Sequence, residues 1–189
     1  MKKTDHRVRV TKRLLRDALT VLLTEKPIDS ITVKELCVRA GINRGTFYAH
    51  YADVYDLLKS IQEEMEAAYF EALRPMMNGT ELLTPPKVTK RIFECIEANA
   101  DLCRATTGPH GDKQFAWDLL RRSKDLCMES YRHFYPNATD QQIGIYYAFI
   151  SGGCASLMDR WIRNGMNESS AELAEAAEKI MQSGIEYLK

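Results

Sequence analysis

Apolar residues recur along this chain at steps of three and four positions, which is the period of an amphipathic α-helix. The first stripe covers residues 7–24, and its opposite face is rich in Lys and Arg. The sequence shows no strand pattern of useful length and no internal repeat. We therefore expect an all-α fold of about nine helices. Beyond residue 52, the predicted helices cover residues 53–74, 87–99, 100–107, 112–134, 139–164 and 169–188.

Residues 31–51 contain two short predicted helices separated by a glycine turn. Thr32 and Glu35 have the spacing of a capping box, in which the Thr side chain caps the helix and the Glu side chain reaches back to its start. Gly41 falls where a left-handed residue ends a helix, and Asn43 can cap the next one. A short helix, a glycine turn and a second short helix form the layout of a helix-turn-helix.

A loop rich in proline and glycine, from Pro75 to Pro86, is the clearest break in the helical pattern. It separates the long helix that Asp53 can cap from the helices that follow. We therefore predict a three-helix N-terminal domain over residues 1–52, a connecting helix over 53–74 and a C-terminal helical domain over 75–189.

The formal net charge of zero conceals an uneven distribution of charge. Residues 1–51 contain eleven Lys or Arg against five acidic residues, so this part is basic and the remainder is acidic. A polyanion is attracted to the basic part. On charge alone, nucleic-acid binding and a solvated basic helix face are about equally good interpretations.

The stretch from Ile31 to Leu58 resembles the DNA-binding domain of the tetracycline-repressor (TetR) family of bacterial regulators. It combines a Thr-Val helix start, an Ala-Gly-Ile turn, a Gly-Thr-Phe-Tyr segment and an aromatic-x-Asp-x-x-x-Leu entry into the fourth helix, all at the family spacing. The resemblance covers about residues 7–60. Beyond it, the helical layout and the segment 146–166 look like the C-terminal domains of some members. The resemblance implies a transcription regulator, most simply a repressor.

A helix-turn-helix inserts its second helix into the major groove, so side chains on residues 43–50 are candidates to reach base edges. Arg44 has the fork that pairs with guanine, Thr46 offers a hydroxyl or a methyl group, and Gly45 permits close approach of the backbone. The family uses matching positions as phosphate contacts, so the resemblance implies this role for Thr32, Lys34, Tyr48 and His50. The predicted DNA-binding residues are Thr32, Lys34, Asn43, Arg44, Gly45, Thr46, Tyr48 and His50. The alternative for Arg44 is an ion pair with an acid of the free protein.

Val54 departs from the family pattern, which commonly has Lys at this position to contact a phosphate. The departure removes one charged contact and so flattens the salt dependence of binding. The basic residues between positions 2 and 13 are candidates to compensate along the DNA, with terminal disorder as the alternative. A protein that keeps this fold but binds a protein partner, with DNA binding weak or lost, remains the second hypothesis.

Residues 141–158 carry no charge and are apolar on more than one helical face, so this helix needs cover on both sides. We expect it to lie between its own core and a partner subunit, because one helix-turn-helix reads too few base pairs and such proteins dimerise across two half-sites. A membrane span is disfavoured, since Gln, Ser and Gly dilute the apolar content. The predicted dimerisation residues are Ile143, Tyr147, Ile150, Cys154, Leu173, Ala177, Ile180 and Met181.

Aromatic and sulfur-containing side chains in the central helices are candidates to line an effector pocket, which the family forms in this region. An ordinary helical core has the same composition, and nothing in the sequence identifies the ligand. The candidate pocket residues are Met65, Tyr69, Phe93, Ile96, Trp117, Leu120, Tyr146 and Phe149.

No pattern of catalytic, metal-ligating or cofactor-binding residues is present, so we expect neither an enzyme nor a bound metal or cofactor. The five cysteines form no C-x-x-C pair, which favours a reducing compartment. The basic start lacks the apolar run of a signal peptide, so we expect a cytoplasmic protein. Its expected partners are double-stranded DNA and a second copy of the chain, with a small-molecule effector or a protein partner as further candidates.

Overall fold

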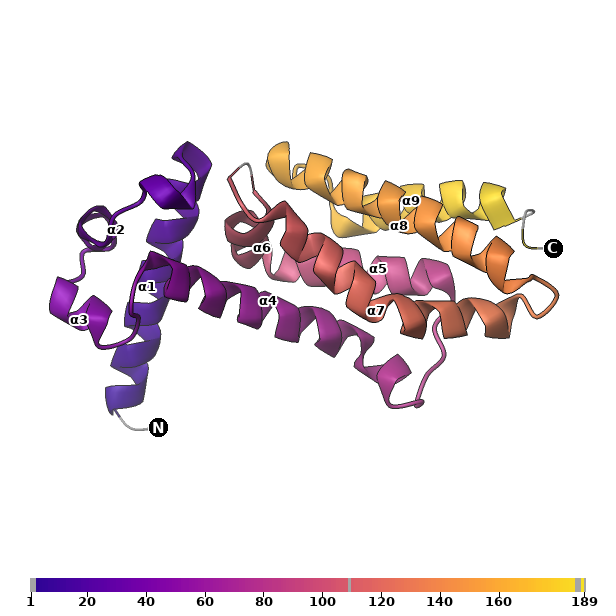
Figure 1. Cartoon of the computed structure of the whole chain (residues 1–189), viewed down its shortest axis with the longest axis horizontal. Coiled ribbons are helices and arrows are strands. Elements are labelled where there is room, and N and C mark those ends of the chain that lie inside the picture. Colours follow the sequence, from indigo (N-terminus) through magenta and orange to yellow (C-terminus); the bar gives the residue numbers. More distant parts are fainter. Residues whose placement is uncertain (1–2, 109, 186–187, 189) are drawn as a thin grey trace. The chain divides into compact units, whose positions relative to one another are not determined.

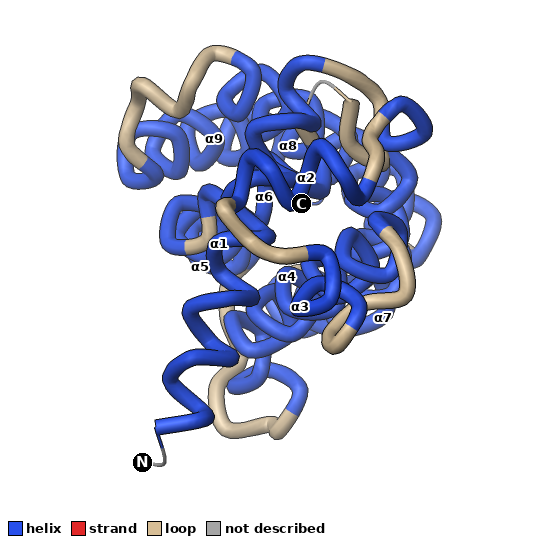
Figure 2. The backbone as a smooth tube through the Cα atoms, turned by 90° about the vertical axis from the view of Figure 1, so that its left-hand side faces the viewer, coloured by secondary structure: helices blue, strands red, loops and turns tan. Residues whose placement is uncertain are grey.

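The computed structural model describes residues 3–108, 110–185 and 188, and within these ranges the chain is built from α-helices and loops without a strand (Figure 2). The predicted all-α fold is confirmed (Figure 1). None of the described helices combines the length and the apolar character needed to span a bilayer. The α-helices are α1 Lys3–Glu25, α2 Val33–Ala40, α3 Arg44–Tyr48, α4 Val54–Met77, α5 Pro85–Ala98, α6 Ala100–Thr107, α7 Lys113–Phe134, α8 Asp140–Arg163 and α9 Ser170–Ile185, with a 3-10 turn at Ile28–Ser30.

Two helix boundaries differ from the predicted ones because of proline. The connecting helix was expected to end before Pro75, but α4 continues to Met77 with Pro75 inside its last turn. Proline lacks a backbone N–H and so removes one hydrogen bond of the helix. Near a helix end, the remaining hydrogen bonds of the last turn can still form around it. α5 begins at Pro85 rather than at residue 87, because proline suits the first positions of a helix, where N–H groups have no partner within the helix.

The chain forms two compact units whose division falls inside α4. The first unit combines Met1–Met65 with Asp101–Lys113, and the second combines Glu66–Ala100 with Gln114–Lys189. The first unit therefore contains α6, where the Cys103 thiol lies 3.4 Å from the Met65 sulfur. Each unit is defined by contacts in space and combines two separate segments of the chain, whereas the predicted boundaries at residues 52 and 74 divide the chain into consecutive segments.

The core of the first unit is formed by the apolar stripe of α1 and by inward side chains of the next three helices. Leu15 and Leu19 of α1 are fully buried, as are Leu36 of α2 and Phe47 of α3. Burying one such side chain contributes about 1.5–3 kcal/mol to folding. The stripe predicted over residues 7–24 thus holds the helix-turn-helix in place.

Two apolar clusters form among the described residues of the second unit, one around Tyr69 and Leu73 of α4 and one around Tyr146 of α8. Trp161 is fully buried, with its ring 6.0 Å from that of Phe93, and its indole N–H donates to the Glu168 carbonyl at 2.8 Å. This bond satisfies the one polar atom of a large buried side chain.

Candidate nucleic-acid interface

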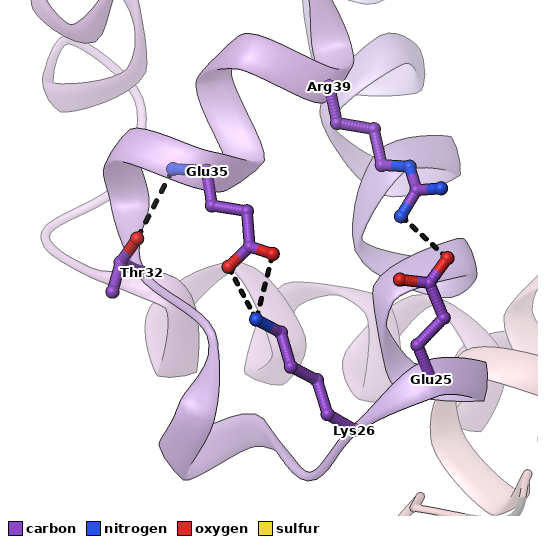
Figure 3. Close-up of polar contacts among 5 residues, drawn as sticks. All are labelled: Glu25, Lys26, Thr32, Glu35 and Arg39. Atoms are coloured by element: carbon purple, nitrogen blue, oxygen red, sulfur yellow. Dashed lines mark hydrogen bonds and ion pairs between the residues drawn. The ribbon is translucent and has the colours of Figure 1, made fainter.

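α2 is held by a cap at its start and by two ion pairs to residues at the end of α1 and just after it, shown in Figure 3. The Thr32 hydroxyl accepts a hydrogen bond from the Glu35 backbone N–H at 3.2 Å, as predicted. The Glu35 carboxylate does not reach back to close the predicted capping box, because it accepts two 2.7 Å bonds from the Lys26 ammonium instead. This contact lowers the pKa of Glu35. Arg39 and Glu25 form a second ion pair at 2.8 Å between α2 and the end of α1.

The turn between α2 and α3 follows the predicted signals. Gly41 has φ +65°, a conformation that residues with a Cβ rarely adopt, and it ends α2. The Ile42 N–H donates to the Cys37 carbonyl at 3.0 Å, which satisfies one of the last carbonyls of the helix. The Asn43 side chain then accepts a bond from the Gly45 N–H at 2.7 Å and caps α3.

α3 turns one aromatic ring inward and leaves its other side chains exposed. Phe47 is fully buried and packs against Tyr48 and Tyr51, with ring centroids 5.4 and 5.9 Å away. Arg44 and Thr46 are exposed. Tyr48 is 59% exposed, which is unusual for a large aromatic side chain.

The alternative role for Arg44, an ion pair within the protein, is not realised. No carboxylate of the described residues pairs with its guanidinium. The predicted phosphate contacts Thr32 and Lys34 are also exposed, at the start of α2. The first unit therefore offers cations, hydroxyls and a phenol at the solvent surface of its helix pair, the groups that bind phosphates and base edges.

Two of the predicted DNA-binding residues have a structural role, and one lies beyond the helix. The Asn43 amide is engaged in the cap, and a Cβ on Gly45 would lie only 3.2 Å from that side-chain oxygen, so a larger residue would disturb the cap. The second helix was expected over residues 43–50 but covers only Arg44–Tyr48. His50 follows it, half-buried, with its ring 6.4 Å from that of Tyr51.

The entry into α4 is capped as expected but carries no positive charge at its first position. The Asp53 carboxylate accepts a bond from the Asp56 N–H at 2.8 Å, and the Asp56 carboxylate accepts one from the Ala52 N–H at 2.9 Å. Val54, the departure from the family pattern, is buried. Tyr55 next to it is hydrogen-bonded to Asp29, which raises the pKa of its phenol.

The basic residues before position 14 lie mainly in α1, since this helix begins at Lys3. Lys2 and the side chain of Lys3 lie outside the described residues. The Lys12 ammonium lies 5.9 Å from the Tyr51 ring centroid, a cation–π contact that joins α1 to the end of the helix-turn-helix. The sequence signals did not single out this contact, because it pairs residues far apart in the chain.

The predicted effector-pocket residues are spread over different parts of the described chain. The second unit contains a cavity of about 50 Å³, and of the predicted set only Tyr69 and Leu120 line it. Trp117 and Phe149 are exposed, and Met65 belongs to the first unit. The remaining three, Phe93, Ile96 and Tyr146, are buried outside the cavity lining.

Most of the predicted dimerisation residues face the interior of their own protomer. Five are buried in the second unit, and two more, Tyr147 and Cys154, line its cavity. Ile180 of α9 alone among them is exposed, at 62%. The large apolar residues of α8 that are exposed are Ile145, at 53%, and Phe149, at 75%. α8 is apolar on two faces, as expected. The face with Ile143 and Ile150 packs into the core, and the face with Phe149 remains exposed. The five buried residues are Ile143, Ile150, Leu173, Ala177 and Met181.

Comparison with known protein families matches both parts of the chain. Residues 15–61 match the family described as "Bacterial regulatory proteins, tetR family". Residues 84–183, more than half of the chain, match "Transcriptional regulator C-terminal region". These families consist of regulators rather than enzymes, as the sequence predicted.

One curated relative and two solved structures extend this finding. An uncharacterized HTH-type transcriptional regulator of Bacillus subtilis, YxbF, is 32% identical over 59 residues, which cover 31% of this chain and 16% of that protein. The fatty acid degradation regulator FadR from Bacillus halodurans has a TM-score of 0.67 at 15% identity, over 93% of this chain and 96% of that protein. A TetR-like transcriptional regulator from Rhodococcus sp. RHA1 also has a TM-score of 0.67, at 16% identity, over 93% of this chain and 95% of that protein.

The structural matches establish the fold, and the family matches establish the class of protein. The helix-turn-helix, with its capped α2, its left-handed Gly41 and its exposed α3, lies within the matched residues 15–61. This chain is therefore a member of the TetR family of transcriptional regulators, with a DNA-binding helix-turn-helix at its N-terminal end.

Proposed function

We propose that this protein is a homodimeric repressor that binds a palindromic operator in the bacterial cytoplasm and changes its affinity when an effector binds the second unit. The observation that carries the proposal is the exposed α3, on which Arg44 has no internal partner among the described residues. Repression is the simplest sign of regulation, because blocking a promoter requires only occupancy. α4 contributes to both compact units, so it is the candidate to couple the effector to DNA binding.

Dimerisation follows from the geometry of DNA. One short helix contacts few base pairs, whereas two copies read half-sites about 34–36 Å apart or a multiple of this distance. We assign the dimer surface to the exposed apolar residues of α8 and α9, because exposed aromatic and aliphatic groups of this size favour burial against a partner. Of the predicted dimerisation residues, Ile180 belongs to this surface.

Selection of bound sites from random duplexes, followed by anisotropy titration of the selected duplex and of a shuffled one, tests the proposal. We expect a palindromic consensus and an affinity for it at least 10³-fold above that for shuffled DNA at physiological salt. Equal affinity for both duplexes, at low as well as moderate salt, would contradict operator binding.

Replacing Phe149 with Asp is expected to dissociate the dimer. A centrally placed aromatic residue commonly contributes about 2 kcal/mol or more to an interface, and the new carboxylate would be buried without a partner. Sedimentation equilibrium measures the monomer–dimer constant. Phe134→Asp is the matched control, since Phe134 is 37% exposed at the end of α7 and outside the assigned surface. A dimer that is unchanged by Phe149→Asp, or weakened equally by both variants, contradicts this surface.

Replacing Val54 with Lys is expected to steepen the salt dependence of DNA binding. A lysine can extend its charged end beyond the buried stem at the start of α4 and supply the phosphate contact that this chain lacks. One added contact per subunit steepens the plot of log K against log salt by about 0.9 per subunit. Val54→Met, which adds an unbranched side chain nearly as long as that of lysine but without its charge, should leave the slope unchanged. An unaltered slope with Lys would show that position 54 does not reach the phosphates.

A second candidate function, a protein-interaction module with weak or lost DNA binding, is favoured by the buried and uncharged Val54. The two candidates differ in which residues their activity needs. Under the second, Arg44→Ala and Tyr48→Phe leave the activity unchanged, whereas substitutions on the second unit abolish capture of the partner from the source cell.

A further inference from the structure

The cavity of the second unit is mostly apolar, and its described lining residues are uncharged. Hydroxyl and thiol side chains line it together with apolar ones, and no described acidic or basic side chain is among them. Burial raises the pKa of Cys127 to about 11 and raises that of Cys154, so both thiols are neutral at pH 7. An ionised group is costly to bury in such surroundings without a countercharge. The cavity therefore suits the uncharged part of a ligand.

One hydroxyl in this cavity is unsatisfied. Tyr131 is only 4% exposed, yet its phenol makes no hydrogen bond with the part of the chain that the structure describes. By contrast, the Tyr69 hydroxyl is bonded to that of Ser123 at 2.8 Å, and the Tyr147 hydroxyl donates to the Leu120 carbonyl at 3.0 Å. The Tyr131 hydroxyl is therefore free to bond a ligand or a water molecule.

A groove of about 360 Å³ lies directly beside the cavity, between α7 and α8 of the same unit. Leu120, Tyr147 and Ser151 line both spaces, so the groove and the cavity share a wall. The Tyr147–Leu120 hydrogen bond lies at this junction and links the two helices. Together the two spaces reach the lower end of the volumes of about 300–1,000 Å³ found for small-molecule sites.

The groove carries positive charge at its surface. Its charged lining residues in the described chain are Arg121 and Lys124, both on α7. Arg121 pairs with Asp118 at 2.9 Å, which balances its charge. No described carboxylate pairs with Lys124, so the groove retains about one unit of positive charge. Trp117, 47% exposed, adds an aromatic surface beside these cations.

We propose that the effector is a small carboxylate whose apolar end enters the cavity past Tyr147 while its carboxylate pairs with Lys124 and Arg121 in the groove. The proposal rests on the effector part of the proposed function and names its ligand class. One net positive charge matches a monoanion better than a doubly charged phosphate ester. A cavity of about 50 Å³ admits only a few heavy atoms, given that one water occupies about 30 Å³ of liquid, so most of the ligand lies in the groove beside Trp117.

The test uses four probes with the same six-carbon tail: hexanoate, 1-hexanol, hexylamine and hexyl phosphate. Each is titrated into the full-length protein without DNA, with calorimetry and Trp117 fluorescence as readouts. The other tryptophan, Trp161, is fully buried outside both spaces and serves as a constant background. We expect hexanoate to bind at least about tenfold more tightly than each of the other three probes, the size of one charge-assisted contact.

Three variants separate the parts of the site. Lys124→Gln is expected to remove the preference for hexanoate over hexanol and to leave hexanol binding unchanged. Lys87→Gln is the matched control, because Lys87 is an exposed lysine of α5 outside both spaces. Ser151→Leu fills the shared wall and should weaken binding of hexanoate and hexanol alike. Thermal unfolding measured on each variant confirms that it folds.

Three outcomes would overturn the proposal: equal affinities for hexanoate and hexanol, a preference that survives Lys124→Gln, and no saturation by any probe at millimolar concentration. Preference for hexyl phosphate or hexylamine would equally contradict a carboxylate site. DNA binding is measured separately by anisotropy, so failure of the ligand titration leaves operator binding intact. Loss of operator binding likewise leaves the ligand titration interpretable.

Discussion

Replacing Arg44 with Ala is expected to weaken binding to the selected operator by about 1–3 kcal/mol per half-site, or about tenfold for every 1.4 kcal/mol. Arg44 is exposed at the first position of α3, where its guanidinium can pair with a guanine in the major groove. Because alanine has a high helix propensity, the substitution should leave α3 intact. Anisotropy titrations of the operator and of variants at each base pair measure the loss and locate the position whose preference relaxes.

Two matched variants show whether the loss is specific to bases. Arg39→Ala removes the same charge, but Arg39 is paired with Glu25, so it should change operator affinity little. Lys34→Ala should weaken binding to all sequences similarly and reduce the salt slope by about 0.9 per subunit, as expected for a phosphate contact. If Arg44→Ala behaves like Lys34→Ala, with no relaxed base position, Arg44 contacts phosphate rather than a base.

Replacing Phe47 with Ala is expected to destabilise the first unit by about 3–5 kcal/mol and to abolish DNA binding. Phe47 is fully buried, and its ring contacts Tyr48 and Tyr51, so its removal leaves a cavity under α3. Both tryptophans belong to the second unit, so their fluorescence does not report on this loss. Hydrogen exchange resolved by peptide is the suitable measurement, because it gives local opening free energies.

We expect amides of α2 and α3 to lose protection in Phe47→Ala while those of α5 and α9 retain it. The control Phe134→Ala makes the same chemical change at a side chain that is already 37% exposed, and should have a small effect on both units. Loss of protection throughout the chain would contradict independent opening of the two units. Unchanged protection in α2 and α3 would show that Phe47 does not support them.

The helix-turn-helix was predictable because its signals are local. Thr32 and Asn43 cap the helices that follow them, and Gly41 takes the left-handed conformation that ends α2. Each of these effects depends on atoms within a few residues in the chain, so residue type and spacing are enough to predict it. The family resemblance rests on the same segment, which explains why it identified the class of protein correctly.

The sequence did not predict contacts correctly where a side chain could pair with residues distant in the chain. Glu35 has the spacing of a capping box, but Lys26 lies within reach once α1 and α2 pack, and an ion pair replaces the predicted bond. The apolar faces of α8 posed a similar problem. Periodicity located two of them, yet it could not show that Ile143 and Ile150 turn to the core while Phe149 turns to solvent.

By itself, the sequence determined the helices, the helix-turn-helix and the family, because hydrogen bonds and caps within a helix depend on neighbouring residues. Tertiary structure alone decided which apolar face is buried, which residues line the cavity and which cations line the groove beside it. Those properties depend on contacts between α4, α5, α7, α8 and α9 of the second unit, and such contacts join residues that no spacing along the chain relates.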